Sequence, residues 1–360
     1  MSAQDISERA DALRMTLQTG GTADYAEVTC QAPSRNFTKA WDLYRQVLLS
    51  PTFPASEVAK VREDLLRQVK SLGDRPFDYT NLKFKSLLYK NSPYRRSVVG
   101  DTVSLAKIRI ADLRQAYETM FCGKNMVVSI VGDFDAAGVL ESSWRGFAAL
   151  RPGAAIAVGD ARDEPPHETR PVFVDKDQEQ VTYNTGWLGC SVRDPDYVPL
   201  RAAVSAIGDK LFFKYVYERG VAYRSWFYMS DRLGQASAQN EMGVTSANYQ
   251  MASSGVLEDI AQMTRDGVTP TALKEVIEKT LSRYFLGGQT NAEQAQRLCY
   301  FEMAGLGYEY ADRYPEMLRK VTPEEVNTVA RKYFDSARYT RAAVGKEEVA
   351  AKASTSAPSR

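Results

Sequence analysis

Apolar residues recur at helical spacing through much of this 360-residue chain. From Ala55 onward they return every three or four positions, and the positions between them carry Arg, Glu, Asp and Lys. This spacing predicts an amphipathic helix with one buried face. Similar spacing predicts further helices at 37–48, 79–89, 110–121, 136–147, from about 197, at 254–264 and at 273–285.

Short runs rich in β-branched and aromatic residues lie between these helices and predict strands. The runs cover residues 15–19, 25–30, 126–131, 172–174, 180–190 and 243–247. Residues 7–13, just before the first run, resemble the tail of a helix. The mixture of helices and strands predicts the α/β (α+β) class.

The second half of the chain repeats the plan of the first. Residues 107–133 align without a gap on residues 320–346, with the same helix-then-strand pattern of apolar positions, which predicts an internal duplication. The second half opens with two strand runs and the helix from about 197, and these have no counterpart in the first half. By this alignment, about 40–50 residues are without a counterpart, and the first domain is predicted to be incomplete at its N-terminus.

The composition of the chain predicts where its domains, linker and tail begin and end. We expect a first domain at 1–150, a linker at 151–171, a second homologous domain at 172–346 and a flexible tail at 347–360. The linker is rich in Pro, Gly and charged residues, which favours an extended connection. The tail consists largely of Ala, Lys, Ser, Thr and Pro, a composition typical of a frayed terminus.

Charge and hydropathy limit the classes of partner that we expect for this chain. The 46 Lys and Arg residues nearly balance the 45 Asp and Glu residues, so we expect no nucleic-acid partner. No stretch has the apolar length of a membrane span, and no signal sequence follows Met1. We therefore expect no membrane partner and a cytoplasmic location as written; a periplasmic one would follow if a signal sequence had been lost with the N-terminus. The cysteines are widely spaced and predict buried free thiols: Cys30, Cys122, Cys190 and Cys299.

Candidate catalytic chemistry is sparse, because His167 is the only histidine. A catalytic zinc ion takes about three protein ligands and keeps one position open for water. His167 lies beside Glu168 in the predicted linker, which favours a solvated surface residue over a ligand or general base. One histidine cannot form the usual site, so no resident metal is expected.

Four runs nevertheless occur in a telling order: Leu48-Leu-Ser-Pro-Thr-Phe-Pro54, Ser92-Pro-Tyr-Arg-Arg-Ser-Val-Val-Gly100, Asn125 to Asp133, and Gly220-Val-Ala-Tyr223. From near residue 7 to about 346 the chain resembles the pitrilysin or insulinase family of zinc metallopeptidases, which includes mitochondrial processing peptidase. The resemblance implies two homologous domains of metallopeptidase/LuxS-like fold, each a mainly antiparallel or mixed sheet backed by helices. It also implies two such pairs that close around a chamber for a peptide.

The resemblance also locates the family's zinc site. Active members bind zinc through an H-x-x-E-H helix, which falls in the segment without a counterpart here, and through a later glutamate. The position of that glutamate matches Gln68, a neutral amide and a poor zinc ligand. Gln68 can equally be an ordinary polar residue on a solvated helix face. We assign no catalytic residue and expect none of the zinc that active members carry.

A second family feature concerns substrate binding. Active members use an arginine and a tyrosine in the partner half to hold substrate near the zinc. Tyr223 matches the tyrosine, but Val216 stands where the arginine is expected, and Arg219 or Arg224 would have to replace it. Tyr223 is thus a candidate substrate-binding residue, and packing against the helix layer is the alternative.

Two functional hypotheses follow. In the first, the chain is a non-catalytic insulinase-like homologue that binds an unstructured peptide, or that pairs with a homologous zinc-bearing catalytic subunit or with itself as a homo-oligomer. In the second, it is a truncated zinc-dependent metalloendopeptidase whose H-x-x-E-H motif is encoded upstream of this start. Gln68 favours the first, because restoring the upstream helix would not restore the third ligand.

Overall fold

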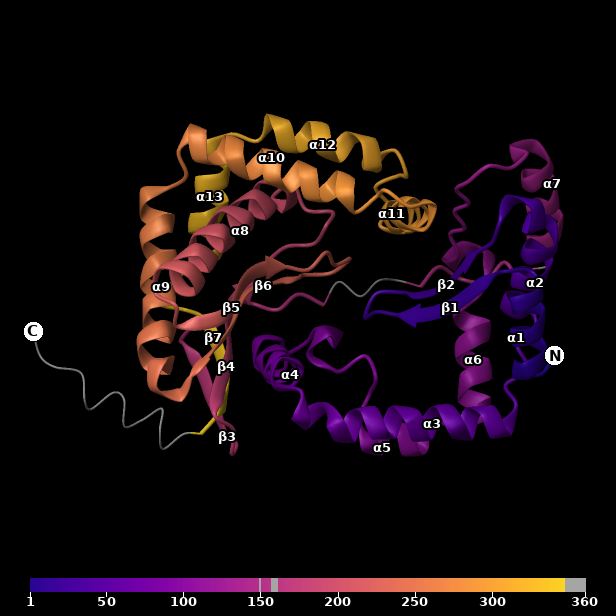
Figure 1. The fold of residues 1–360 in the computed structure, drawn as a ribbon, viewed down its shortest axis with the longest axis horizontal. Helices are drawn as coiled ribbons and strands as arrows, with labels where there is room; N and C mark the ends of the chain where they lie inside the picture. Colours follow the sequence, from indigo (N-terminus) through magenta and orange to yellow (C-terminus); the bar gives the residue numbers. More distant parts are fainter. Residues whose placement is uncertain (149, 157–160, 347–360) are drawn as a thin grey trace, which may run out of the picture. The chain divides into compact units, whose positions relative to one another are not determined.

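The computed structural model describes residues 1–148, 150–156 and 161–346, so the predicted tail at 347–360 lies outside it. The chain divides into two compact units, each assembled from separate stretches of sequence (Figure 1). The first unit contains Met1–Lys70, Val98–Val158 and Gly287–Glu309. The second contains Ser71–Ser97, Gly159–Leu286 and Tyr310–Arg360, as far as these are described.

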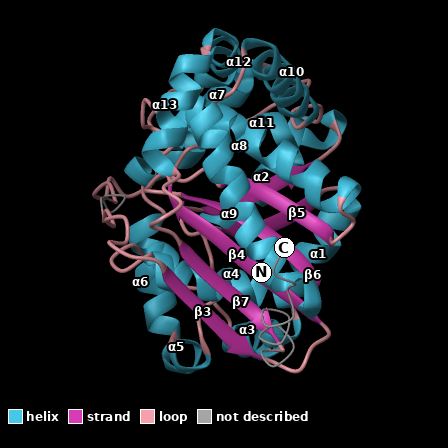
Figure 2. Ribbon diagram, turned by 90° about the vertical axis from the view of Figure 1, so that its left-hand side faces the viewer, coloured by secondary structure: helices cyan, strands magenta, loops and turns pink. Residues whose placement is uncertain are grey.

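Within the described residues, the second unit is built on a five-stranded mixed sheet (Figure 2). Its strands are β3 (Arg170–Asp175), β4 (Gln180–Leu188), β5 (Ala222–Met229), β6 (Ser237–Thr245) and β7 (Thr340–Gly345). Their spatial order is β3-β7-β4-β6-β5. Strands β3 and β7 are parallel, and the other neighbours are antiparallel. Strand β5 is therefore an edge strand, whereas β4 lies in the middle.

Helices cover both faces of this sheet. On one face, the ring of Tyr183 on β4 lies 5.5 Å from that of Tyr249, which begins α9 (Tyr249–Asp266). On the other face, Thr182 Oγ1 lies 2.7 Å from Thr80 Oγ1 on α4 (Pro76–Leu88). Successive strand residues point to opposite faces, so α9 and α4 lie on opposite sides. This double cover explains why every residue of β4 after Gln180 is buried.

Further helices complete the layer on the α9 side. Trp187 of β4 points to that side and packs against Phe334, the C-cap of α13 (Pro323–Tyr333). Helix α8 (Tyr197–Phe212) contacts both β5 and α13, and it is covered in turn by α10 (Pro270–Leu286) and α12 (Tyr310–Lys320). A π-helical turn, Phe213–Glu218, joins α8 to the approach of β5.

In the first unit, the described strands form a single antiparallel hairpin, β1 (Thr16–Gly21) with β2 (Ala26–Gln31). The helices of this unit are α1 (Ala3–Ala12), α2 (Phe37–Leu49), α3 (Ala55–Lys70), α5 (Thr102–Lys107), α6 (Ile110–Met120), α7 (Ala136–Phe147) and α11 (Asn291–Met303). Its core is small: one buried cluster consists of Ala10, Met15, Ala40 and Leu43.

The α/β (α+β) class is confirmed, since each unit combines helices with a sheet. The helices predicted at 37–48, 110–121 and 136–147 coincide closely with α2, α6 and α7. Residues 7–13 belong to a complete helix rather than to a tail, because α1 begins at Ala3 with a capping box between Ser2 and Asp5.

The strand predicted at 126–131 is wrong. These residues are outside the strands that the structure describes, and no backbone–backbone hydrogen bond joins them to another described residue. A strand exists only where a neighbouring strand pairs with its backbone groups. The apolar pattern is present here, but the paired neighbour is not.

The compact units also divide the chain differently from the predicted domains. Helix α4 precedes residue 150 yet belongs to the second unit, because Phe84 and Leu88 share a buried cluster with Leu188 and Ala342. Conversely, α11 follows residue 172 yet belongs to the first unit. The homology of the two halves stays a prediction.

The described part of the predicted linker is not wholly solvated. Asp163 is buried, and its carboxylate accepts backbone N–H bonds from Lys90, Asn91 and Ser92 at 2.6–3.0 Å. Strand β3 then begins at Arg170, inside the segment predicted as linker. His167 lies between these two points and is exposed.

Two further expectations concern thiols and membranes. All four cysteines are free, with Cys122 and Cys190 buried and Cys30 and Cys299 half-buried. Among the helices of the described chain, none combines the length and apolar character needed to span a bilayer.

Candidate functional site

The position matched to a zinc ligand does not fit a metal. Gln68 is exposed near the end of α3, where it offers a neutral amide beside the cationic Arg67. Within the described residues, no group of three or more His, Cys, Asp and Glu side chains could hold a metal ion. The donor set around Gln68 therefore does not suit a catalytic zinc ion, which takes about three such ligands.

Tyr223 lies at the start of the edge strand β5. The pairing of β5 with β6 shifts between Ala222 and Arg224, so Tyr223 occupies a bulge. Its ring is 6.0 Å from that of Phe77 on α4, in an edge-to-face arrangement. It also lies over Gly243 of β6, where a Cβ atom would meet the ring at 2.8 Å. With this support Tyr223 remains 56% exposed.

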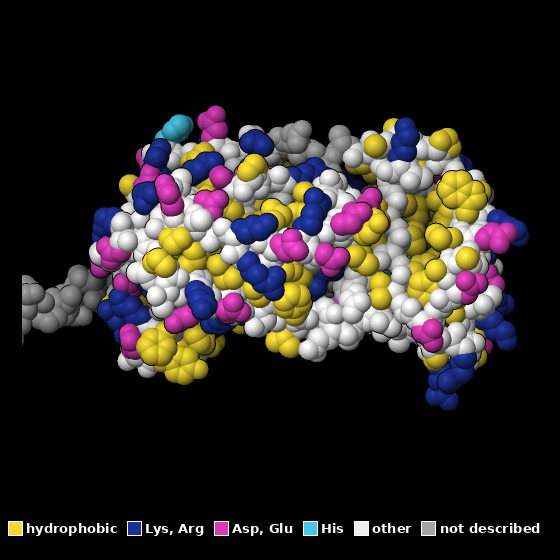
Figure 3. Space-filling model, turned by 90° about the horizontal axis from the view of Figure 1, so that it is seen from above, with side chains coloured by type: hydrophobic (Ala, Val, Ile, Leu, Met, Phe, Trp, Pro, Cys, Tyr) yellow, Lys and Arg dark blue, Asp and Glu magenta, His cyan; other side chains and the backbone are white. Residues whose placement is uncertain are grey.

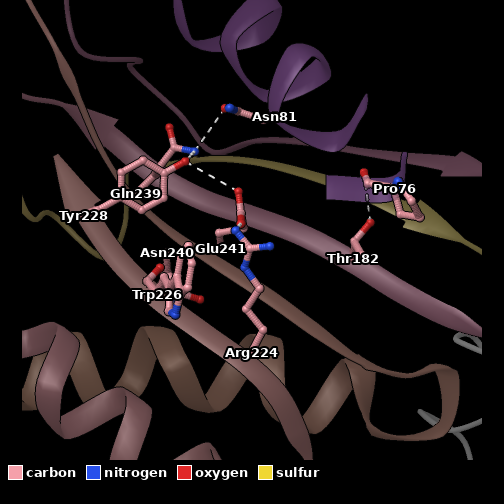
Figure 4. Close-up of polar contacts among 9 residues, drawn as sticks. All are labelled: Pro76, Asn81, Thr182, Arg224, Trp226, Tyr228, Gln239, Asn240 and Glu241. Atoms are coloured by element: carbon pink, nitrogen blue, oxygen red, sulfur yellow. Dashed lines mark hydrogen bonds and ion pairs between the residues drawn. The ribbon is translucent and has the colours of Figure 1, made fainter. Parts of the chain in front are cut away.

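The next residue places a cation between two aromatic rings. The guanidinium carbon of Arg224 lies 4.3 Å from the centre of the Phe77 ring and 4.0 Å from that of Trp226. Arg224 Nη2 lies 2.7 Å from Glu241 Oε1 on β6 (Figure 4). Aromatic faces attract a cation, and an ion pair orients its planar head. The guanidinium is thus fixed in place before any ligand arrives.

Glu241 anchors a chain of hydrogen bonds beneath this arginine. The Tyr228 hydroxyl donates to Glu241 Oε2 at 3.5 Å and accepts from Gln239 Nε2 at 3.0 Å. Gln239 also donates to Asn81 Oδ1 on α4, at 3.1 Å. The Glu241 side chain is only 5% exposed. Burial raises the pKa of its carboxyl, and the positive charge of Arg224 opposes that effect.

Strand periodicity explains why these groups gather. Arg224, Trp226 and Tyr228 alternate along β5, and residues two apart share one face of a sheet. The register sets Trp226 opposite Glu241 and Tyr228 opposite Gln239. Figure 4 shows α4 contributing Asn81 from above this face.

The outer part of the site remains open. Trp226 is 52% exposed, comparable to Tyr223, and among the described strands β5 pairs on one side only, with β6. Exposed aromatic rings, a fixed guanidinium and an edge strand with no described strand on its outer side are suited to binding an extended polypeptide. We call the surface formed by Phe77, Tyr223, Arg224 and Trp226 the β5 site.

The structure separates the two arginines considered as substitutes for the missing family arginine. Arg224 contacts Phe77, as Tyr223 does. Arg219 instead lies over the ring of Tyr215, at 5.4 Å. Val216 is half-buried in the π-helical turn. Of the sequence candidates, only Tyr223 and Arg224 thus meet at one site.

Sequence reasoning missed Trp226, Tyr228 and Glu241. The alternation Arg-x-Trp-x-Tyr along β5 is a signal that could have revealed the first two. No local signal identifies Glu241 or the contributions of α4, because these depend on which helix packs on the sheet.

Comparison with known proteins gives a consistent result. Residues 107–280 match the sequence profile of the Peptidase M16 inactive domain. An uncharacterized zinc protease, YmxG of Bacillus subtilis, is 21% identical over 338 residues, which are 92% of this chain and 81% of that protein. A protein from Helicobacter pylori named as a non-peptidase homolog is 22% identical over 343 residues, or 90% of this chain and 75% of that protein.

The fold has a close counterpart among solved structures. The crystal structure of a peptidase M16 inactive domain from Pseudomonas fluorescens matches with a TM-score of 0.88 at 19% identity, over 96% of this chain and 84% of that one. At this identity the match establishes the fold alone. The expected metallopeptidase-type architecture is therefore confirmed.

Proposed function

Because this chain is M16-like over nearly its whole length and residues 107–280 match the inactive domain of that family, we propose that it is a non-catalytic homologue that binds an extended peptide at the β5 site. One observation carries the proposal. Two exposed rings, Tyr223 and Trp226, lie on an edge strand beside the guanidinium of Arg224, which is already held in place.

Main-chain pairing would supply part of the affinity. An extended peptide placed beside β5 gains backbone hydrogen bonds along a strand that pairs only with β6 in the described sheet. Its alternate side chains would meet Tyr223 and Trp226. Aromatic rings supply large contact areas with few rotatable bonds, so they are frequent energetic centres of interfaces.

The Arg224–Glu241 pair would supply orientation. Arg224 is held by two rings and one carboxylate, so a ligand carbonyl or carboxylate meets a cation that loses little further freedom on binding. Prior organisation of this kind lowers the entropic cost of association.

Pairing with a homologous zinc-bearing subunit is compatible with the same surface, since a peptide held by one chain can be presented to another. The alternative of a truncated zinc endopeptidase is disfavoured by Gln68, because a neutral amide stands where that family uses a carboxylate ligand.

Fluorescence anisotropy with a labelled, unstructured peptide of about 15 residues tests the proposal. We expect saturable binding by the wild-type chain and a dissociation constant about tenfold higher, or more, for Trp226→Ala. Trp144→Ala is the matched control: Trp144 is 82% exposed, but it lies on α7 in the first unit.

Two results would contradict the proposal. Equal binding by the wild type and Trp226→Ala would remove the β5 site from peptide binding. Cleavage of the same peptide by the homogeneous chain, abolished by a chelator, would show that the protein is an enzyme.

A further inference from the structure

Helix α4 directs one stripe of side chains along strand β6. The Asn81 side chain accepts a hydrogen bond from Gln239 Nε2 at 3.1 Å (Figure 4). Two turns later, the Tyr89 hydroxyl donates to the Gln235 carbonyl at 3.1 Å. Residues four apart share one face of a helix, and Lys85 lies midway between Asn81 and Tyr89. Lys85 is therefore part of the same stripe and faces the same side of the sheet.

The ammonium group of Lys85 is short of negative charge. Its side chain is half-buried, and within the described residues no ion pair or side-chain hydrogen bond involves it. Burial lowers the pKa of this group, the positive charge of Arg232 lowers it further, and the negative charge of Glu241 opposes both effects. Burying an ammonium group without a paired counter-ion costs free energy. Such a cost is typical of groups that meet a ligand.

Two carboxylates near this stripe are already paired with arginines. Glu241 Oε1 lies 2.7 Å from Arg224 Nη2. In the first turn of α4, Asp78 Oδ2 lies 3.0 Å from Arg75 Nη1. Each of these carboxylates balances the charge of one guanidinium, so neither is left to balance the Lys85 ammonium group. The counter-charge is therefore one that a ligand can supply.

Distances along the helix and the strand relate Lys85 to the β5 site. Gln239 contacts both Asn81 and the Tyr228 hydroxyl, so these two residues are level. Helix α4 and strand β5 run in the same direction along β6. Four residues of helix advance by about 6 Å, which equals about two residues of a strand. Lys85 is therefore level with the position two residues after Tyr228, which is four residues after Trp226.

A peptide that adds to β5 would place its side chains with the same periodicity. Residues four apart on a strand share one face. When one side chain of the peptide meets Trp226, the side chain four residues away is brought towards Lys85. An aspartate or glutamate at that position can reach the ammonium group with its carboxylate. A charge-assisted hydrogen bond of this kind is among the stronger polar contacts in proteins.

The wider surface provides no general attraction for acidic peptides. The 46 Lys and Arg residues of the chain nearly balance its 45 Asp and Glu residues. Over the face of the second unit that Figure 3 shows, Lys and Arg side chains are interspersed with Asp and Glu side chains. A long-range field needs an excess of one sign of charge. A preference for an acidic ligand therefore has to come from individual groups such as Lys85.

We infer that the β5 site selects peptides with an acidic side chain four residues from the one that meets Trp226, and that Lys85 makes this selection. The inference rests on the peptide binding proposed above and names the class of ligand. That ligand is an extended peptide in which a large apolar or aromatic residue and an aspartate or glutamate lie four positions apart. Lys85 is then a specificity-determining residue, and Trp226 supplies contact area.

The other classes of side chain gain nothing at this position. A neutral side chain leaves the Lys85 ammonium group without a counter-ion, and a basic side chain adds a like charge beside it. Specificity is a difference between affinities, and an unmatched charge contributes to that difference as a matched charge does. The expected order of affinity is acidic, then neutral, then basic.

Fluorescence anisotropy with the whole chain provides the test. The probes are labelled peptides of about 15 residues that differ at two positions only. Each has one large apolar residue, a central leucine that fixes the register. The positions four before and four after it carry glutamine at both, glutamate at the first only, or glutamate at the second only. We expect one glutamate peptide to bind about tenfold more tightly than the other two peptides, and its identity reports the direction of the peptide on β5.

Substitutions on α4 assign the preference to one side chain. Lys85→Met keeps the aliphatic stem and removes the charge, so we expect it to bind the three peptides alike. Lys83→Met is the matched control. Lys83 is a half-buried lysine on the same helix, but its ammonium group lies 5.0 Å from the centre of the Tyr79 ring, so this variant should keep the preference of the wild type. Added salt should reduce that preference, because it screens charges.

The outcomes separate this inference from the proposed function. Equal binding of the three peptides, weakened for all of them by Trp226→Ala, would overturn the inference and leave the proposed function intact. A glutamate preference that persists in Lys85→Met would also overturn it, because another group would then select the charge. Absence of saturable binding, or binding that Trp226→Ala leaves unchanged, would contradict the proposed function itself, and the inference would fail with it.

Discussion

The two sheets differ most in how they are covered. In the second unit, β4 is enclosed by α4 on one face and by the α9 side on the other, and it is buried from Val181 to Leu188. In the first unit, β1 has no buried residue. The comparison teaches that an apolar sequence pattern specifies which face of a strand can be buried, while neighbouring strands and helices decide whether it is.

The largest expected effect comes from a substitution in α4, the helix that covers one face of the five-stranded sheet. Phe84 on α4 is fully buried against Leu188 and Ala342, so Phe84→Ala leaves a cavity at the centre of the second unit. We expect the free energy of unfolding of this unit to fall by about 3–5 kcal/mol. Urea denaturation followed by circular dichroism measures the change.

Trp144→Ala is the matched aromatic control in the first unit. Its side chain is 82% exposed, and exposed substitutions usually change stability by about 0.5 kcal/mol or less. If the two substitutions destabilise equally, burial does not distinguish the units as described.

A smaller effect comes from a pair of aligned valines. Val344 in β7 is fully buried, whereas Val131, its counterpart in the ungapped alignment of the two halves, is only half-buried. Val344→Ala should cost about 2 kcal/mol, from the lost methyl groups and the cavity. Val131→Ala should cost about 0.5 kcal/mol or less.

The same urea denaturation measures both valine variants. Similar losses at the two positions would mean that Val131 is as well enclosed as Val344.

Much of the fold was predictable because it depends on local sequence. The amphipathic spacing after Ala55 predicts α3, and the pattern after Phe37 predicts α2. These signals act over a few residues, within the reach of helix propensity and capping.

The remainder depends on contacts between distant residues. Nothing in residues 76–88 indicates that α4 packs in the second unit, and the valines at 127–128 have the composition of a strand without its neighbours. At the β5 site, Tyr223 was a candidate from a family resemblance, and its substrate-binding role stays a prediction. Glu241 was not, because its role follows from burial against residues on three different elements.

The smallest effect concerns the pH dependence of the buried carboxyl in the second unit. Burial raises the pKa of Glu241 above the ordinary value of 4.5 for a glutamate carboxyl, against the opposing attraction of Arg224. The folded protein therefore holds this proton more tightly than the unfolded chain does. The resulting stabilisation is fully present below the unfolded pKa and is lost as the pH rises through the folded pKa.

Glu241→Gln keeps a side chain that can accept hydrogen bonds but cannot titrate. We expect the unfolding free energy of the wild type, relative to this variant, to decline as the pH is raised above 4.5. Urea denaturation of both proteins at successive pH values measures the decline. A relative stability that instead increases with pH would mean that the attraction of Arg224 outweighs burial. The pKa of Glu241 in the folded protein would then lie below that in the unfolded chain.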